Sequence, residues 1–422
     1  MAEQSTNVST EGEAPLRVGV AGLGFGSTEF LPTLERMAQI KLVAAADFRQ
    51  HALEAFRARY GGRTYGTVAE LCSDPEVEAV WIATPNQYHA EHALLAAQHG
   101  KHMVVRKPLA LTMEDCQRVV DAADQTGARI LAGGQTQGSN PLVQEVRRMI
   151  LAGELGRLCA INIWAYTGWM LRPRMPQEVD EAQGGGIVWR QAPHQIETVR
   201  WLGGGMVRSV RAMTGRWRPE RPHGTGYYAA YLEFEDGTPV TMVYGAYGYF
   251  DSVELVSWGT DRAVEERVAF RRGLVQGAID EPKGKEGTRF GALVEGGSAP
   301  QIPWESGGGG GGGPRQWLPG NQGVFIASCE RGDVRMSPQG LYVYDDDGAR
   351  EVHIAQGSGP GMMPFLGSEP LELYNAVRHN RPMLHDGRWG MATAEVQWAI
   401  IESAKQRREI TLTHQVPAPA GY

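Results

Sequence analysis

Three basic side chains, at two places in the chain, could together perform acid–base chemistry on a charged substrate. Lys107 ends the apolar run "HMVVRKP", and His194 follows a glycine triplet in "GGGIVWRQAPHQIE", with Arg190 four residues before it. A lysine or histidine can take the proton from a hydroxyl group, and an arginine binds a carboxylate through two parallel hydrogen bonds. The combination predicts proton removal from an anionic substrate. For Lys107 the alternative is a surface lysine in a loop.

The conformation of the segment after the glycine triplet decides how Arg190 and His194 lie relative to each other. If this segment is helical, the two side chains project from the same face because they are four residues apart. Pro193 would kink that helix, since it lacks an amide proton and crowds the carbonyl four residues back. The alternative for His194 is a core histidine bonded to the backbone, and Glu197, one turn on, is a candidate to orient it.

A second pair of arginines precedes the glycine triplet. Arg172 and Arg174 lie in "GWMLRPRMP" and could add to the binding of a substrate carboxylate. A proline-bounded loop often carries arginine at the surface, so an exposed basic loop is an equally good interpretation.

The start of the chain has the pattern of a nucleotide-binding unit. "LRVGVAGLGFGS" reads as a strand, a tight glycine turn and the start of a helix. Gly22 and Gly24 fill two places of the dinucleotide fingerprint, and Ser27, with Gly26 just before it, stands at the third. A glycine turn without a ligand is the alternative. The cofactor contacts expected in this loop are Gly22, Gly24, Phe25 and Gly26.

An acidic residue follows the second apolar run, "IKLVAAADFRQ". Asp47 stands at the distance from the glycines where a carboxylate binds the hydroxyls of the adenosine ribose. That position favours NAD over NADP, although the nearby Arg49 could meet a ribose phosphate. The alternative for Asp47 is the N-cap of the helix that follows.

Strands and helices then alternate, which predicts a parallel, doubly wound sheet. In such sheets ligands bind beyond the carboxyl ends of the strands. We therefore expect "TPNQYH" and "RKP" to lie on the same edge as the glycine loop, with Lys107 beside the cofactor. For His89 the alternative is to cap or pack the following helix. The cofactor contacts expected in "TPNQYH" are Thr84, Pro85, Asn86 and His89.

The second half of the chain changes to period-two segments joined by short turns, as in a largely antiparallel sheet. The fold class expected is therefore α/β: a Rossmann domain followed by an α+β domain with an open, largely antiparallel sheet. A chain of 422 residues is long enough for two cores.

The seven glycines Gly307–Gly313 indicate a flexible loop. The functional alternative is a lid over the active site, with Trp304 or Trp317 as its apolar plug. The divisions expected are a disordered tail at 1–15, an NAD-binding domain at 16–140, and a second domain at 141–415 with a flexible insertion at about 270–320.

Composition narrows the possible partners. A formal net charge of -7 with scattered basic residues gives no nucleic-acid footprint. The four cysteines are widely separated, and no histidine–carboxylate cluster has metal-site spacing, so neither disulfides nor a metal is expected. His379 and His385 are expected at the surface or in a turn. Without a signal peptide or an apolar membrane span, we expect a soluble cytoplasmic protein.

Four motifs together resemble the Gfo/Idh/MocA oxidoreductases: "GLGFGS", "ATPNQYHAEHALLAAQHGKH", "KPLA" and the opening glycine triplet with its histidine. The resemblance implies a two-domain NAD(P)-dependent enzyme in which Lys107 and His194 assist hydride transfer at a hydroxyl-bearing carbon. It also implies a second domain that forms the substrate wall and the contact surface of a homodimer or homotetramer. The chain departs from the family pattern at Arg106, where glutamate is usual, and at Arg190, where aspartate is usual.

Within the family, "WMLRPRMP", "GGGIVWRQAPHQ", "GGGMVRSVRAMTG", "SCERGDVR" and "LHDGRWGMATAEV" are similar to the bacterial phthalate cis-dihydrodiol dehydrogenases. The resemblance implies NAD-dependent oxidation of a carboxylated cis-dihydrodiol, here 4,5-dihydro-4,5-dihydroxyphthalate, to the catechol in aromatic-acid catabolism. Arg190, Arg172 and Arg174 would then bind the carboxylate. The alternatives are a sugar, inositol or glycoside dehydrogenase of the same family and a non-catalytic NAD-binding sensor, which would not require Lys107.

Overall fold

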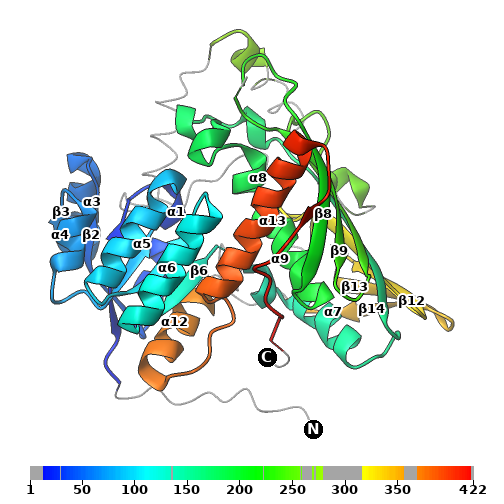
Figure 1. Cartoon of the computed structure of the whole chain (residues 1–422), viewed down its shortest axis with the longest axis horizontal. Helices are drawn as coiled ribbons and strands as arrows, with labels where there is room; N and C mark the ends of the chain where they lie inside the picture. Colours follow the sequence, from blue (N-terminus) through cyan, green and yellow to red (C-terminus); the bar gives the residue numbers. More distant parts are fainter. Residues whose placement is uncertain are drawn as a thin grey trace.

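Two sheets with different strand directions organise the computed structural model (Figure 1). In Figure 1 the first sheet and its helices lie on one side, the second sheet lies on the other, and the long helix α13 runs between them. The structure describes residues 13–28, 30–134, 136–221, 223–256, 258, 269, 272–278, 316–355 and 368–419. The glycine run and Trp304 lie outside these residues, as do the first twelve residues of the expected tail.

The first sheet is parallel throughout, with the strand order β3-β2-β1-β4-β5-β6. Its central strands are apolar on both faces, because helices cover both sides. The order reverses between β1 and β4, which is where doubly wound sheets bind ligands. The strands are β1 (Leu16–Ala21), β2 (Ile40–Ala46), β3 (Arg63–Tyr65), β4 (Ala79–Ile82), β5 (His102–Arg106) and β6 (Ile130–Gly133). The helices are α1 (Phe25–Thr28), α2 (Leu31–Arg36), α3 (Gln50–Tyr60), α4 (Val68–Ser73), α5 (His89–Gln98) and α6 (Met113–Thr126).

The second sheet has the order β14-β13-β12-β11-β7-β10-β9-β8-β15, and all its neighbours are antiparallel except β10 and β7. One face packs against α7, α9 and α13, while alternate residues such as Tyr231 and Met213 are exposed on the other face. The expected fold class is confirmed. The strands are β7 (Leu158–Tyr166), β8 (Val207–Gly215), β9 (Tyr227–Phe234), β10 (Pro239–Gly245), β11 (Val324–Cys329), β12 (Gly332–Met336), β13 (Gly340–Asp345), β14 (Gly348–His353) and β15 (Ile410–Thr411). The helices are α7 (Pro141–Leu151), α8 (Gly186–Arg190), α9 (Ala192–Gly203), α12 (Ser368–His379) and α13 (Gly387–Gln406).

Short 3-10 helices occupy several of the connections. The tryptophan offered as a lid plug, Trp317, lies instead against the second domain's core, where its indole donates to the carbonyl of Ile354. The 3-10 helices are η1 (Asn86–Tyr88), η2 (Thr136–Ser139), η3 (Trp169–Leu171), η4 (Pro176–Glu178), η5 (Glu181–Gln183) and η6 (Ser252–Leu255).

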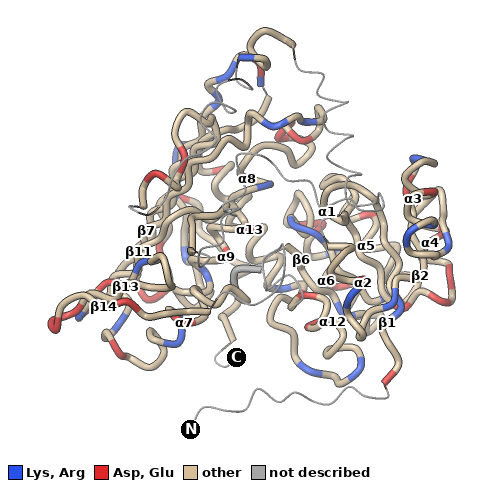
Figure 2. Tube along the Cα trace, turned by 180° about the vertical axis from the view of Figure 1, so that it is seen from behind, with Lys and Arg blue, Asp and Glu red and all other residues tan. Residues whose placement is uncertain are grey.

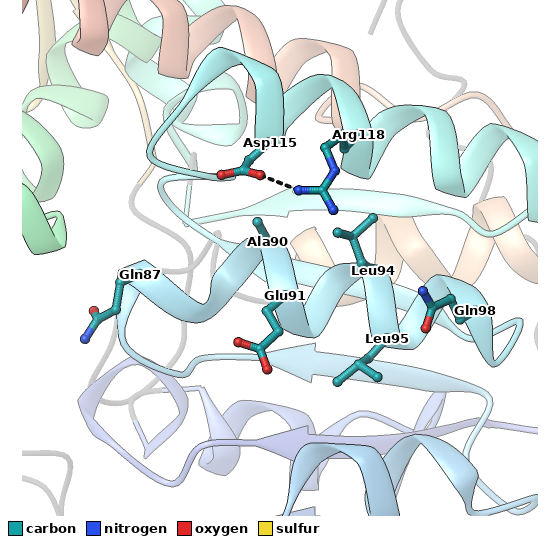
Figure 3. Close-up of a pocket in the computed structure, with 8 residues that line it drawn as sticks. All are labelled: Gln87, Ala90, Glu91, Leu94, Leu95, Gln98, Asp115 and Arg118. Atoms are coloured by element: carbon teal, nitrogen blue, oxygen red, sulfur yellow. Dashed lines mark hydrogen bonds and ion pairs between the residues drawn. The ribbon is translucent and has the colours of Figure 1, made fainter.

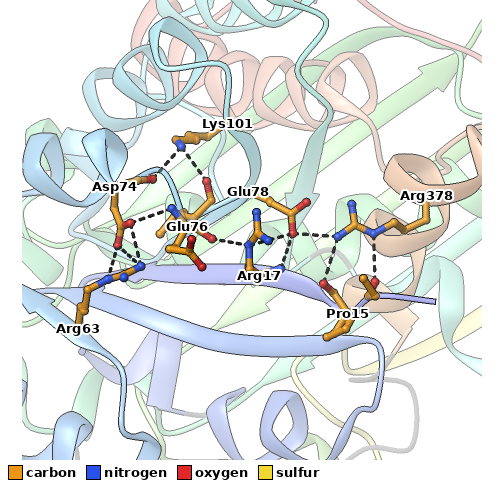
Figure 4. Close-up of polar contacts among 10 residues, drawn as sticks. Pro15, Arg17, Arg63, Asp74, Glu76, Glu78, Lys101 and Arg378 are labelled. Carbon is orange, nitrogen blue, oxygen red and sulfur yellow. Dashed lines mark hydrogen bonds and ion pairs between the residues drawn. The ribbon is translucent and has the colours of Figure 1, made fainter. Parts of the chain in front are cut away.

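The C-terminal helices return to the first domain. Leu373 and Tyr374 of α12 are buried in the core of the first sheet. Arg378 of the same helix pairs with Glu78 at 2.8 Å and donates to the carbonyl of Pro15 beside β1 (Figure 4). The last two helices therefore belong structurally to both domains.

A buried ion cluster joins these helices to α9. The imidazole of His385 lies 2.8 Å from Glu372 through Nδ1 and 3.3 Å from Glu197 through Nε2. His385 is only 1% exposed, so the expected surface position is wrong, and the residue lies in the bend between α12 and α13. Burial acts to lower the pKa of His385, but the two carboxylates outweigh it and raise that pKa to about 10. The imidazolium is thus a permanent cation at neutral pH.

This cluster predicts a pH dependence of stability. Because the folded pKa of His385 exceeds its unfolded value of about 6.5, its stabilisation is complete below about pH 6.5 and is lost as the pH rises through about 10. We expect the melting temperature to fall across this window in the wild type, and to fall less steeply in His385→Gln. His353→Gln, whose imidazole is 73% exposed, is the control and should keep the wild-type slope. Equal slopes for all three proteins would contradict the prediction.

Candidate functional site

The carboxyl ends of β1, β2, β4 and β5 meet at one edge of the first sheet, as expected from the parallel order. The glycine loop begins there, with the Gly22 amide donating to the carbonyl of Ala46. Gly22 has φ +87°, and a Cβ on it would lie 2.9 Å from the carbonyl oxygen of Ala83. Only glycine lets the loop pass this close to the neighbouring strand end. A Cβ on Gly24 would meet no atom within 4 Å, so the backbone there is open to close approach by a dinucleotide, which is the fit that the cofactor requires.

Asp47, at the end of β2, is tied to its surroundings by four hydrogen bonds. Its Oδ2 accepts from the Leu23 amide of the glycine loop, and the other three donors belong to Arg49. Burial acts to raise the pKa of Asp47, but these hydrogen bonds lower it below its usual value. The N-cap position of α3 is Arg49 rather than Asp47, so the alternative role as helix cap does not hold.

The "TPNQYH" segment contacts the second domain and also another loop of the first domain. The amide of Asn86 donates to the carbonyl of Gly184 at 2.7 Å, and contact of Asn86 with the cofactor stays a prediction. His89 is buried, with its ring nitrogens 2.7 Å from the carbonyl oxygen of Pro108 and 2.9 Å from that of Thr84. Burial lowers the pKa of His89 to about 4. The packing of His89 fits the packing alternative, and its contact with the cofactor stays a prediction.

Lys107 lies where the two domains meet. Its amide donates to the carbonyl of Gly133, and its Nζ donates to the backbone carbonyl of Arg190 at the end of α8. The segment does not form the single kinked helix that was one possibility for it. The chain forms two helices, α8 and α9, with Gln191 between them and Pro193 in the first turn of α9, where a missing amide proton costs nothing. The break exposes the carbonyl that Lys107 contacts.

His194 is in the first turn of α9 and is partly buried. Burial and the positive charges of Lys107, Arg106 and Arg172 hold the pKa of His194 well below its usual range, so the imidazole is neutral. The expected partnership with Glu197 is wrong, because that carboxylate bonds to Trp389 and His385. A neutral imidazole close to Lys107 can accept a hydrogen bond or a proton.

Arg174 is buried rather than exposed, which rules out the surface-loop alternative for this residue. Its guanidinium lies 3.7 Å above the ring centre of Trp169 and donates to the carbonyl of that residue at 2.9 Å. Burial and nearby positive charges, first among them Arg172, hold the pKa of Arg174 well below its usual range, against the opposing effect of Glu178. The positive charges of other guanidinium groups therefore act on the Arg174 side chain.

The arginine cluster comprises four residues: Arg172, Arg174, Arg190 and Arg221. The charges of Arg190 and Arg221 also act on Arg174. Arg190 lies 3.4 Å from Glu178, and Arg221 donates to the carbonyl of Arg172. Figure 2 shows basic segments at α8 and between α1 and β6, on the facing sides of the two domains. Sequence reasoning missed Arg221, whose only signal was the basic stretch "RWRPERPHG" far from the glycine triplet.

The glycine triplet allows the arginine-bearing loop to fold back on itself. A Cβ on Gly185 would lie 2.5 Å from the Asp180 amide nitrogen, and Gly186, with φ +77°, would place one 3.1 Å from the Thr225 amide nitrogen. The Ile187 amide donates to the carbonyl of Thr225. The triplet therefore starts α8 at a point where three backbone segments meet.

Arg106 has a partner that accounts for its departure from the family pattern. Its Nη1 lies 3.7 Å from the buried carboxylate of Glu369, and its guanidinium lies 4.2 Å above the ring centre of Phe30. Glu369 also accepts from the Gly134 amide at 2.6 Å. A cation is thus accommodated beside Lys107 because α12 supplies the opposite charge.

A separate groove lies on the outer surface of α5 and α6 (Figure 3). The ion pair between Asp115 and Arg118, at 2.9 Å, lies on its α6 side. Gln87, which follows Asn86 in the "TPNQYH" segment, lines this groove, whereas Lys107, His194 and the arginine cluster do not. Its lining residues are Gln87, Ala90, Glu91, Leu94, Leu95, Gln98, Asp115 and Arg118.

Comparison with known proteins defines the class. Residues 16–133 match the NAD-binding Rossmann domain of the Gfo/Idh/MocA oxidoreductases, and residues 143–265 match the C-terminal domain of that family. The chain is an NAD-dependent dehydrogenase. It belongs to the Gfo/Idh/MocA family, because it is also 31% identical to a full-length relative over 92% of its own length and 95% of that relative.

That relative is the 1-carboxy-3-chloro-3,4-dihydroxycyclohexa-1,5-diene dehydrogenase of Comamonas testosteroni. Inositol 2-dehydrogenase 2 of Saccharopolyspora erythraea is 29% identical over 57% of this chain and 70% of its own. Among solved structures, a protein of Bordetella bronchiseptica RB50 described as a dehydrogenase is 33% identical, with a TM-score of 0.79 over 94% of this chain and 100% of its own.

The described residues lack two further kinds of feature. No group of three or more histidine, cysteine, aspartate or glutamate side chains there could hold a metal ion. No helix in the same part of the chain is long and apolar enough to cross a membrane.

Proposed function

We propose that this dehydrogenase oxidises a carboxylated cis-dihydrodiol to the corresponding catechol, with NAD as the hydride acceptor. The observation that carries the proposal is the arginine cluster beside the Lys107–Arg190 contact. Guanidinium groups carry a positive charge and donate two parallel hydrogen bonds to a carboxylate, so they suit a carboxylate better than a neutral polyol. The Comamonas relative acts on a carboxylated dihydroxycyclohexadiene, as its name states, which supports the same substrate class here.

Each group of residues in the site has a separate role in the proposed reaction. Lys107 takes the proton of one ring hydroxyl, and the carbonyl of Arg190 orients its amine. The neutral His194 hydrogen-bonds the same oxygen or relays the proton. The arginine cluster holds the carboxylate and so fixes the ring in place. The nicotinamide, when bound, would accept the hydride from the carbon that carries this hydroxyl. The ketone formed at that carbon then tautomerises to the catechol.

The number of arginines favours a substrate with two carboxylates. The positive charges of the other three arginines of the cluster all act on Arg174, so the guanidinium groups repel one another. A second carboxylate would stabilise the cluster by offsetting this repulsion. We therefore propose 4,5-dihydro-4,5-dihydroxyphthalate as the substrate. A homodimer or homotetramer through the exposed face of the second sheet is part of the same proposal.

The test is NADH formation by the purified protein with NAD, followed by near-ultraviolet absorbance. The substrates are the phthalate cis-dihydrodiol, a monocarboxylated cis-dihydrodiol, an uncharged cis-dihydrodiol, glucose and inositol. We expect turnover of the carboxylated diols, with the largest kcat/KM for the dicarboxylate. Turnover of the polyols alone would move the protein to the sugar branch, and binding of NAD without turnover of any substrate would favour a sensor.

A further inference from the structure

A buried carboxylate lies among the arginines that we assign to the substrate. Glu178 ends η4, its side chain is only 8% exposed, and its Oε1 lies 3.4 Å from Nη1 of Arg190. Its other oxygen, Oε2, accepts from the backbone amide of Met175 at 2.8 Å. The carboxylate is therefore anchored to its own turn as well as to Arg190.

The charge of Glu178 acts on more than one arginine. Burial and the other three arginines of the cluster act to lower the pKa of Arg174, whereas Glu178 acts to raise it. Guanidinium groups stay protonated in proteins, so the unfavourable interaction at Arg174 is repulsion between like charges. Buried charges without an opposite charge are costly. Glu178 therefore offsets part of the repulsion within the arginine cluster.

The ion pair between Glu178 and Arg190 leaves room for competition. Close charge-assisted hydrogen bonds from nitrogen to a carboxylate are about 2.7–2.9 Å long, whereas this pair is at 3.4 Å. The side chain of Arg190 is 21% exposed, more than that of Glu178, so a ligand can reach it from solvent. An incoming carboxylate is attracted by the arginines and repelled by Glu178, because like charges repel.

We propose that Glu178 is the resident counter-ion of the substrate site, which holds the arginine cluster together when the site is empty and sets how tightly carboxylates bind. Glu178 then determines selectivity by substrate charge, since it opposes a dicarboxylate more than a monocarboxylate and does not oppose an uncharged ligand. This role rests on the proposed function in one respect, that the arginine cluster binds the carboxylates of the substrate. It does not require turnover of any diol.

The experiment is equilibrium binding of three unreactive aromatic ligands to the full-length protein, by calorimetric titration with NAD present. Phthalate carries two carboxylates, benzoate one and benzamide none. Glu178→Gln keeps the shape and an oxygen for the amide of Met175, so it removes mainly the charge. We expect this variant to bind benzoate about tenfold more tightly and phthalate up to about a hundredfold, because electrostatic free energy scales with ligand charge. Its affinity for benzamide should equal that of the wild type.

Two further variants separate charge from shape. Glu178→Asp keeps the charge, so its ratio of phthalate to benzoate affinity should stay close to that of the wild type. Glu114→Gln removes an exposed carboxylate of α6 and should change no affinity. If Glu178→Gln does not fold, the same comparison is made in the Arg190→Gln background, where one positive charge fewer lowers the repulsion. Phthalate should again bind more tightly once Glu178 is replaced.

The outcomes distinguish this role from the proposed reaction. Weaker binding of both acids by Glu178→Gln would overturn the proposal and make Glu178 an orienting partner of Arg190. Equal changes for all three ligands would overturn it as well, because they would not depend on charge. If no variant binds either acid, the cluster is not a carboxylate site, and both proposals fall. Charge-dependent binding without turnover of any diol would remove only the reaction and leave Glu178 as the counter-ion.

Discussion

Replacing Lys107 by alanine is expected to slow turnover of the carboxylated cis-dihydrodiol by a factor of about 10² to 10⁴, the usual contribution of a general base. The amine of Lys107 lies at the meeting point of the domains, fixed by the carbonyl of Arg190, and no other lysine shares this position in the described chain. The measurement is kcat from NADH formation at saturating substrate. Affinity for NADH, measured separately, should change little.

Two further variants make this result interpretable. Lys107→Arg keeps a cation at the site, but its guanidinium stays protonated and cannot take a proton from the substrate. This variant should therefore be as slow as the alanine variant if Lys107 is a base. Lys405→Ala removes an amine that is 74% exposed on the last turn of α13, and it should behave as the wild type. Full activity of Lys107→Ala would remove this lysine from the mechanism and leave His194 as the candidate base.

Replacing Arg190 by glutamine is expected to raise KM for the carboxylated diol by about ten- to a hundredfold, because hydrogen bonds to a charged group contribute about 1.5–3 kcal/mol. The substitution leaves the backbone carbonyl that Lys107 contacts in place. The effect on kcat should therefore be smaller than the effect on KM. The measurement is the set of kinetic constants for the dicarboxylated, monocarboxylated and uncharged diols.

The contrast between substrates separates binding from structure. An uncharged diol gains nothing from the guanidinium, so its kcat/KM should be unaffected by Arg190→Gln. Arg118→Gln on α6, whose side chain is 59% exposed, is the control for loss of an arginine elsewhere. If Arg190→Gln weakens NADH binding as much as diol binding, Arg190 has a structural role through Glu178 and is not the carboxylate ligand.

The first domain could be predicted well from the sequence because its signals are local. A glycine loop after an apolar strand, and an acidic residue after the next strand, each need only a few neighbouring residues to be recognised. The parallel order then brings their ends together without further information. For this reason Gly22, Asp47 and Lys107 were all expected on the edge where the structure places them.

The parts that could not be predicted depend on contacts between distant segments. The pairing of Arg106 with Glu369 joins residues that are 263 positions apart, and no motif marks Glu369 as the partner. Arg221 joins the arginine cluster through a loop whose path is set by tertiary packing. Pro193 was ambiguous for a different reason, since proline is compatible with the first turn of a helix and disruptive in its interior. Only the break at Gln191 decided between the two.

The contact between Lys107 and Arg190 uses the backbone of Arg190, while its side chain belongs to the arginine cluster. On the proposed function, one position therefore carries two roles that mutation can separate. A substitution at residue 190 would change which substrate the proposed enzyme recognises and would keep the carbonyl that Lys107 contacts. New substrate preferences could thus arise by single changes at this position without an inactive intermediate, which gives the scaffold a direct route to functional divergence.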